Sequence, residues 1–525
     1  MSLPLTVRTA ALGAAAALVL AACSQSTIGT ITQGSSSASP LPTGSSTPSA
    51  TADPDVDPAL APFYTQRLNW ASCGGSYQCA QLTVPLDYKE PTGETIKLSV
   101  IRLKSSRGGT HLGSLFINPG GPGSSAIDFA RGARSVFPEE VLAAYDVVAF
   151  DPRGVQRSEP VTCLTDPQLD TFLSIDATPD DPAEVAQLDT AFKQLAQGCE
   201  QRSGKVLAHI STEETARDMD VLRGAIGEKK LDYFGFSYGT LLGATYADLF
   251  PTKVDRMVLD GAVDPALDQV ALQHGQAKGF EMALRRFVES CDQQSDCPLP
   301  DGTQAGLDRI AQFFDDLDSK PLPTGDPKRP LTQALGQAAV LTYLYFPAYG
   351  DWDALRTGLA AALDGDGSVL LDMLDQRNER SSTGKYGNNL QYAYYAVNAL
   401  AQPERPTTAQ VATLAEQWKK EAPILGPLFA WVNDVWQHWP VAATETPRAL
   451  AAKGAPPILV VGTTYDPATP YSWSQAMAKE LSSGVLLTRV GDGHTGYGKG
   501  SACTDNAVNR YLLAGDPPAA GTVCR

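Results

Sequence analysis

Seven short apolar runs constrain the fold of this chain more than any other feature. They are rich in Val, Ile and Leu, and helical patterns such as 212–226 and 240–249 lie between several of them. Alternation of this kind indicates an α/β fold, with a mostly parallel sheet covered by helices on both faces. The predicted strands are 96–103, 114–118, 146–151, 231–236, 256–260, 457–462 and 484–490.

The alternation stops after Asp264 and resumes at Pro457. The residues between them contain helical patterns and no evident buried strand. A helical block between two strands of one sheet is an insertion over the edge where ligands of open α/β sheets bind. We therefore predict a sheet domain formed by residues 58–264 and 453–525, and a helical cap domain formed by residues 265–452.

The N-terminus predicts export. Arg8 precedes an apolar stretch at 10–20 that is short for a membrane span, and Leu-Ala-Ala-Cys follows at 20–23. This pattern resembles a bacterial lipoprotein signal, with residues 1–22 removed and lipid attached to Cys23. The alternative is an ordinary secretory signal. Residues 23–57 are rich in Ser, Thr, Gly and Pro and predict a flexible tether. We expect the protein at the extracellular face of the cytoplasmic membrane, with a released, secreted form as an alternative.

The chain has nine cysteines, and an even number remains if Cys23 carries lipid. An even set in an exported chain indicates disulfides, but eight cysteines allow 105 pairings and the sequence does not choose among them. We expect neighbours to pair, because each pair then closes one local loop. The expected pairs are Cys73 with Cys79, Cys163 with Cys199, Cys291 with Cys297, and Cys503 with Cys524. The rival interpretation, a metal site, lacks a Cys-x-x-Cys pair or a nearby His, so we expect no metal and no other cofactor.

The formal net charge is −17. Such a surface repels phosphate backbones and anionic lipid headgroups. We therefore expect no nucleic-acid partner, and membrane contact only through the lipid anchor. We also expect a monomer.

The strongest local signal is Gly-Phe-Ser-Tyr-Gly at 235–239, between the predicted strand 231–236 and a helical pattern. A strand, Gly-x-Ser-x-Gly and a helix form a nucleophile elbow, in which a sharp turn lifts the serine hydroxyl clear of the sheet. The sequence therefore predicts Ser237 as a nucleophile rather than a structural turn serine.

A serine nucleophile needs a base and an acid that orients the base. In this topology both follow the serine, the acid first. Among the five histidines, His494 lies in a Gly-rich loop after the strand 484–490, and Asp466 lies just after the strand 457–462. We predict His494 as the base and Asp466 as its partner, with Asp260 and Asp264 as competitors for the acid.

Two backbone N–H groups are expected to stabilise the oxyanion of a tetrahedral intermediate. One belongs to Tyr238, directly after the nucleophile. The other comes from Asn-Pro-Gly-Gly-Pro-Gly at 118–123, after an early strand. We favour Gly121 for this role and keep Gly120 as the alternative.

Six motifs occur together in the chain. They are Val-Pro-Leu-Asp-Tyr at 84–88, Asn-Pro-Gly-Gly-Pro-Gly at 118–123, Asp-Pro-Arg-Gly at 151–154, Gly-Phe-Ser-Tyr-Gly-Thr at 235–240, Asp-Pro-Ala-Thr-Pro at 466–470 and Gly-His at 493–494. With these motifs, roughly 63–525 resembles the secreted actinobacterial tripeptidyl aminopeptidases, in the prolyl-aminopeptidase branch of the α/β-hydrolases. The resemblance implies the α/β-hydrolase fold and a serine peptidase that removes short peptides, such as tripeptides, from free N-termini through an acyl-enzyme on Ser237.

The chain departs from this family at Gln156, where many relatives have a second glycine. It also offers no cap acid that matches the carboxylates with which prolyl aminopeptidases hold the substrate amine. A carboxylesterase or lipase remains an alternative, because it would use the same three residues. An exported binding protein without catalysis is a third hypothesis, which the intact Ser, Asp and His set disfavours.

Overall fold

The computed structural model describes residues 56–106 and 110–525. The predicted signal peptide, Cys23 and the tether up to residue 55 lie outside the described residues. Within the described ranges, no helix is both long and apolar enough to cross a membrane.

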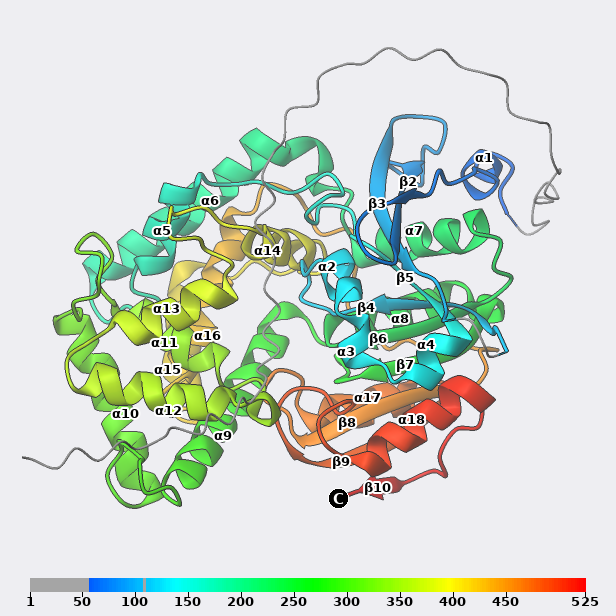
Figure 1. The fold of residues 1–525 in the computed structure, drawn as a ribbon. Coiled ribbons are helices and arrows are strands. Elements are labelled where there is room, and N and C mark those ends of the chain that lie inside the picture. The colour runs from blue at the N-terminus through cyan, green and yellow to red at the C-terminus, as the bar shows by residue number, and fades with distance from the viewer. Residues whose placement is uncertain (1–55, 107–109) are drawn as a thin grey trace, which may run out of the picture. The chain divides into compact units, whose positions relative to one another are not determined.

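A ten-stranded sheet lies at the centre of the fold, in the order β1-β2-β3-β5-β4-β6-β7-β8-β9-β10 (Figure 1). The pairs β1–β2, β2–β3 and β3–β5 are antiparallel. All other neighbouring pairs, from β5–β4 to β9–β10, are parallel. This arrangement confirms the predicted α/β fold with a mostly parallel sheet. The strands are β1 (Ala71–Ser72), β2 (Tyr77–Pro85), β3 (Thr95–Leu103), β4 (Gly113–Asn118), β5 (Tyr145–Phe150), β6 (Leu231–Phe236), β7 (Val254–Asp260), β8 (Ile458–Tyr465), β9 (Gly484–Asp492) and β10 (Thr522–Cys524).

Helices cover both faces of this sheet. Successive side chains of each strand point to opposite faces, so each strand contributes side chains to two cores. In β6, Tyr233 packs into one core and Phe234 into the other. The first core also takes side chains from α7 (Thr212–Ala225), α8 (Tyr238–Leu249) and α17 (Tyr471–Glu480). The second takes side chains from α2 (Ala126–Arg131), α3 (Ala133–Val136), α4 (Glu139–Ala144) and α18 (Ala502–Ala514).

The chain between β7 and β8 is helical, and within the described residues it adds no strand to the sheet. Its helices are α9 (Gln269–Cys291), α10 (Thr303–Ser319), α11 (Gln333–Thr342), η2 (Pro347–Tyr349), α12 (Asp351–Leu363), α13 (Ser368–Arg377), α14 (Leu390–Leu400), α15 (Thr408–Trp418), α16 (Gly426–Trp431) and η3 (Val432–His438). Two helices from earlier in the chain join this layer, α5 (Asp166–Ser174) against α11 and α6 (Pro182–Leu207) against η3 (Figure 1). Their part in this layer was not predicted, because they lie far from the helical insertion in the chain.

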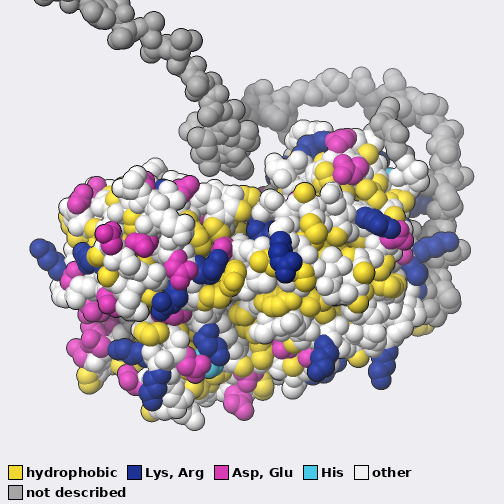
Figure 2. Space-filling model, turned by 90° about the horizontal axis from the view of Figure 1, so that it is seen from below, with side chains coloured by type: hydrophobic (Ala, Val, Ile, Leu, Met, Phe, Trp, Pro, Cys, Tyr) yellow, Lys and Arg dark blue, Asp and Glu magenta, His cyan; other side chains and the backbone are white. Residues whose placement is uncertain are grey.

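The cysteines form four disulfides, and the pairs are the expected ones: Cys73–Cys79, Cys163–Cys199, Cys291–Cys297 and Cys503–Cys524. The last of these ties α18 to β10, the final strand of the sheet. On the face shown in Figure 2, acidic and basic side chains are interspersed over the helical side, as is usual for a solvated surface.

Candidate active site

Ser237 lies in the turn between β6 and α8, with φ of 57° and ψ of −127°. A positive φ is uncommon for a residue other than glycine and occurs often at functional turns. The flanking glycines make this turn feasible. A Cβ atom on Gly235 would lie 2.3 Å from the carbonyl oxygen of Gly239, and one on Gly239 would lie 2.8 Å from that of Asn118. The Gly-x-Ser-x-Gly pattern is therefore required by close packing of the backbone.

Asp466 and His494 are in direct contact, as predicted. The Nδ1 atom of His494 lies 2.9 Å and 3.0 Å from the two carboxylate oxygens of Asp466. Both residues are buried. The carboxylate also accepts hydrogen bonds from the backbone N–H groups of Ala468, Thr469 and Thr495. These bonds fix the carboxylate, so that it holds the imidazole by Nδ1 and leaves Nε2 free to face a reacting group.

Asp260, one of the two competitors for the acid role, has a different task. Its carboxylate accepts hydrogen bonds from the backbone N–H groups of Gly496 (2.7 Å) and Tyr497 (2.8 Å). It thereby anchors the loop that carries His494 to the end of β7. Burial raises the pKa of Asp260 to about 6, although the two N–H donors lower it. This role was not predicted, because an aspartate at the end of a strand has no sequence pattern of its own.

Ser237 and His494 both lie beside the end of β7, at Asp260 and the following residue Gly261. The N–H of Ser237 donates to the carbonyl oxygen of Asp260 (2.9 Å). A Cβ atom on Gly261 would lie 3.3 Å from Cε1 of His494. The described residues show no hydrogen bond between the Ser237 hydroxyl and the imidazole, and this bond is often long before substrate binds. The structure thus brings the serine to the side of the Asp466–His494 pair.

The loop 118–123 packs against the nucleophile. A Cβ atom on Gly120 would lie 2.8 Å from Cβ of Ser237 and 3.0 Å from the backbone nitrogen of Tyr238. The N–H of Gly120 already donates to Oδ1 of Asn118 (2.9 Å). This engagement favours Gly121 over Gly120 as the second oxyanion donor. Tyr238 is the first residue of α8, so its N–H lies at the helix N-terminus, where the helix dipole favours negative charge.

The helical layer contributes contacts that the sequence analysis did not find. The carbonyl oxygen of Tyr345 accepts a hydrogen bond from the backbone N–H of His494 (2.7 Å). The ring centroids of Tyr345 and Phe346 lie 5.6 Å and 6.1 Å from the centroid of the imidazole. Burial raises the pKa of the Tyr345 hydroxyl well above its usual value. No local motif marks these aromatic residues, because they reach His494 through long-range packing.

A second link from the helical layer holds the histidine loop from α9. Arg286 donates from Nη2 to Oδ2 of Asp492 (2.9 Å), and its Nε also contacts that carboxylate. The guanidinium carbon lies 3.8 Å from the ring centroid of Tyr465. Because Asp492 and Tyr465 end neighbouring strands beside His494 and Asp466, Arg286 links α9 to both of the segments that carry the pair.

Three groups of side chains in the described part of the chain could hold a metal ion, and none of them includes Ser237, Asp466 or His494. The candidate active site offers a hydroxyl, an imidazole held by a carboxylate, and the backbone N–H groups of Tyr238 and the 118–123 loop beside the serine, a set suited to acyl transfer.

Comparison with known proteins shows the family to which this chain belongs. Residues 422–524 match the family described as "TAP-like protein". The serine protease Hip1 of Mycobacterium tuberculosis is 35% identical over 488 residues, covering 88% of this chain and 92% of the relative. The chain belongs to the TAP-like family of α/β-hydrolases.

Two further relatives are similar over most of the chain. Carboxylesterase B of M. tuberculosis is 36% identical over 480 residues, covering 88% of this chain and 91% of the relative. The tripeptidyl aminopeptidase of Streptomyces lividans is 31% identical over 481 residues, covering 87% and 86%. Membership confirms the resemblance to tripeptidyl aminopeptidases, the α/β-hydrolase fold and the predicted enzyme class. The protein is a serine hydrolase in a family that includes named peptidases.

Proposed function

We propose that this TAP-like protein is a serine peptidase that releases short peptides from substrates with a free N-terminus. The observation that carries the proposal is the contact between His494 Nδ1 and both oxygens of Asp466, beside a serine held in a strained turn. Relatives named serine protease and tripeptidyl aminopeptidase, at 35% and 31% identity, support peptide bonds as the target.

In the proposed mechanism, His494 Nε2 takes the proton of the Ser237 hydroxyl as the oxygen attacks the substrate carbonyl carbon. Asp466 stabilises the imidazolium through Nδ1. The N–H groups of Gly121 and Tyr238 bind the oxyanion of the tetrahedral intermediate. His494 then gives its proton to the leaving amine, and an acyl-enzyme remains on Ser237. Water, activated by the same imidazole, attacks the ester and releases the short peptide.

A carboxylesterase is the second candidate, because a relative at 36% identity carries that name. Ester and amide acyl transfer pass through the same type of intermediate, so the triad alone does not separate the two functions. The deciding experiment compares synthetic peptides with free and acetylated N-termini, and short-chain esters, by product mass and by kcat/KM. The peptidase proposal expects release of short N-terminal fragments, which acetylation abolishes. Efficient ester hydrolysis with no peptide cleavage would refute it.

We also propose that the enzyme is exported and held at the membrane by lipid on Cys23, and acts as a monomer. The support for export is the signal-like sequence at 1–23 and the four disulfides, which form in oxidising compartments. The test is detergent phase partition of the protein from its native host. Wild-type protein is expected in the detergent phase and the Cys23→Ser variant in the aqueous phase, whereas equal partition of the two would contradict lipidation.

A further inference from the structure

A group of three side chains joins helix α6 to segment η3 in the helical layer. Asp189 lies on α6, and Asp434 and His438 lie on η3. One oxygen or nitrogen atom from each lies within 4.8 Å of the others. The Nε2 atom of His438 is 2.7 Å from Oδ1 of Asp189. Two carboxylates and an imidazole form a set of donors that transition-metal ions bind.

The carboxylate of Asp434 is buried, and one of its oxygens has no partner among the described residues. This residue has no exposed surface. Its Oδ1 accepts a hydrogen bond from the side-chain amide of Gln437 (2.6 Å), but its Oδ2 is buried and has no hydrogen-bond partner among the described residues. A buried carboxylate oxygen without a partner is costly. Burial raises the pKa of Asp434 and the nearby Asp189 adds to this rise, whereas the Thr408 hydroxyl and the His438 imidazole lower the pKa in part.

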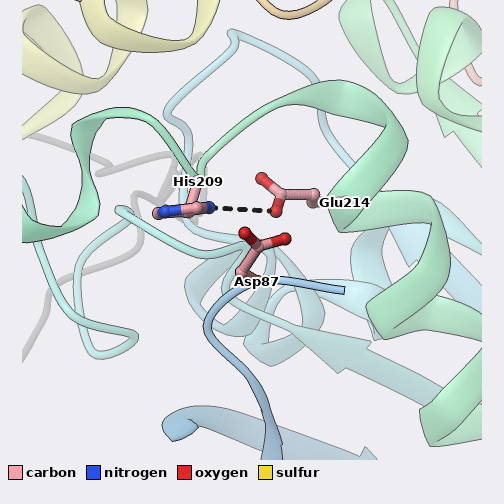
Figure 3. A group of neighbouring side chains, drawn as sticks. All are labelled: Asp87, His209 and Glu214. Carbon is pink, nitrogen blue, oxygen red and sulfur yellow. Dashed lines mark hydrogen bonds and ion pairs between the residues drawn. The ribbon is translucent and has the colours of Figure 1, made fainter. Parts of the chain in front are cut away.

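The two other groups differ from this one. The first of them, like Asp434, has a buried carboxylate oxygen without a hydrogen-bond partner in the described part of the chain, Oε2 of Glu214. Figure 3 shows Asp87, His209 and Glu214, where His209 contacts Glu214. There, however, a nitrogen of the buried Arg153 lies 3.5 Å from Glu214, so that a fixed guanidinium already supplies positive charge.

The third group, Asp176, Glu184 and Asp318, contains no imidazole. Oδ1 of Asp176 is engaged by the backbone N–H and hydroxyl of Thr178. Neither this group nor the one with Arg153 combines an imidazole with an uncompensated buried carboxylate.

We propose that Asp189, Asp434 and His438 bind one divalent transition-metal ion, such as Zn²⁺, with water completing the coordination. The two negative charges match a dication. Ligand atoms approach Zn²⁺ to about 2.0–2.2 Å, so the donors must close slightly around it. The Asp189 side chain is 34% exposed and can turn to do so. Bound metal would replace the His438–Asp189 hydrogen bond by a cross-link between α6 and η3, which stabilises the helical layer.

The test uses full-length enzyme that has been stripped with a chelator, desalted, and dialysed against increasing Zn²⁺, with metal measured by elemental analysis. The proposal expects one Zn²⁺ per chain that is lost, or bound at least tenfold more weakly, in His438→Gln and in Asp189→Asn. Both substitutions keep a polar side chain, so the metal-free variants are expected to fold, as circular dichroism would show. His209→Gln is the matched control, and it is expected to bind Zn²⁺ like wild type.

Thermal unfolding gives a second readout that does not depend on peptidase activity. Saturating Zn²⁺ is expected to raise the melting temperature of wild type and His209→Gln by about 1–3 °C, and to leave that of His438→Gln unchanged. Absence of stoichiometric Zn²⁺ binding to wild type, or equal binding by wild type, His438→Gln and Asp189→Asn, would overturn the proposal. If the peptidase assignment fails, these results stand unaltered, because they measure only metal and stability.

Discussion

Two buried aspartates lie beside His494, and their contacts predict different consequences for substitution. Asp466→Asn presents an amide to Nδ1 and loses the charge that stabilises the imidazolium, so kcat is expected to fall on the order of 10³–10⁴-fold. Its NH₂ group also meets at least one backbone N–H that the carboxylate accepted, so the fold is expected to lose about 1–3 kcal/mol. Asp260→Asn keeps one acceptor but turns an NH₂ group toward the N–H of Gly496 or Tyr497. It is expected to destabilise the fold by about 1–3 kcal/mol and to lower kcat less than Asp466→Asn does. Urea unfolding and kcat measured on both variants check this. The assignment would be contradicted if Asp260→Asn matched the kcat loss of Asp466→Asn while remaining fully stable.

Much of the candidate site could be predicted at the level of single residues. Ser237, Asp466 and His494 each stand in a Gly- or Pro-rich turn at the end of a predicted strand, so the sequence contains both the residue and its place in the sheet. The contacts of Asp260, Tyr345 and Phe346 could not be predicted, because they depend on how a distant loop or helix packs. Gly121 was already favoured over Gly120, but the hydrogen bond from the Gly120 N–H to Asn118 that supports this choice could not be predicted.

Among the elements, helix α9 links the helical layer to the catalytic loop through Arg286. Arg286→Ala removes the pairing with Asp492 and the stacking on Tyr465. We expect kcat to fall about tenfold to a hundredfold, because a loosened loop misplaces the imidazole. Arg285→Ala is the control, since Arg285 is exposed on the same helix and should leave kcat near the wild-type value. Equal rates for both variants in a steady-state assay would show that this link does not position His494.

The buried parallel strands could be predicted as elements, since they are continuous apolar runs. The runs led to β3–β9 within a few residues at each end. Strand β2 was missed because it is partly exposed and carries polar residues such as Gln78 and Gln81. Strand β10 was missed because three residues carry no periodicity. The packing of α5 and α6 with the helical insertion also escaped prediction, because it joins segments far apart in the chain.

For the whole molecule, a buried carboxyl group predicts how stability changes with pH. Burial, with Asp255 nearby, raises the pKa of Asp232 to about 7. The folded protein therefore holds this proton between about pH 4 and pH 7, where the unfolded chain has lost it, so that stability falls as pH rises through this window and levels off above it. Asp232→Asn removes this titration. Between pH 5 and pH 8, the free energy of unfolding of wild type is expected to fall by up to about 2–3 kcal/mol more than that of Asp232→Asn. The measurement is urea unfolding of both proteins across this pH range. If the free energy of unfolding of the two proteins changed with pH in the same way, Asp232 would not titrate in this range.

The most direct test of the account is whether the Ser237 hydroxyl is activated by His494. An active-site-directed fluorophosphonate is added to wild type and to His494→Ala, and the modified peptide and its rate of formation are measured by mass spectrometry. The account predicts a single adduct on Ser237 in wild type, formed on the order of 10³-fold more slowly in His494→Ala. An unmodified Ser237 in wild type, or equal labelling rates in the two proteins, would contradict it.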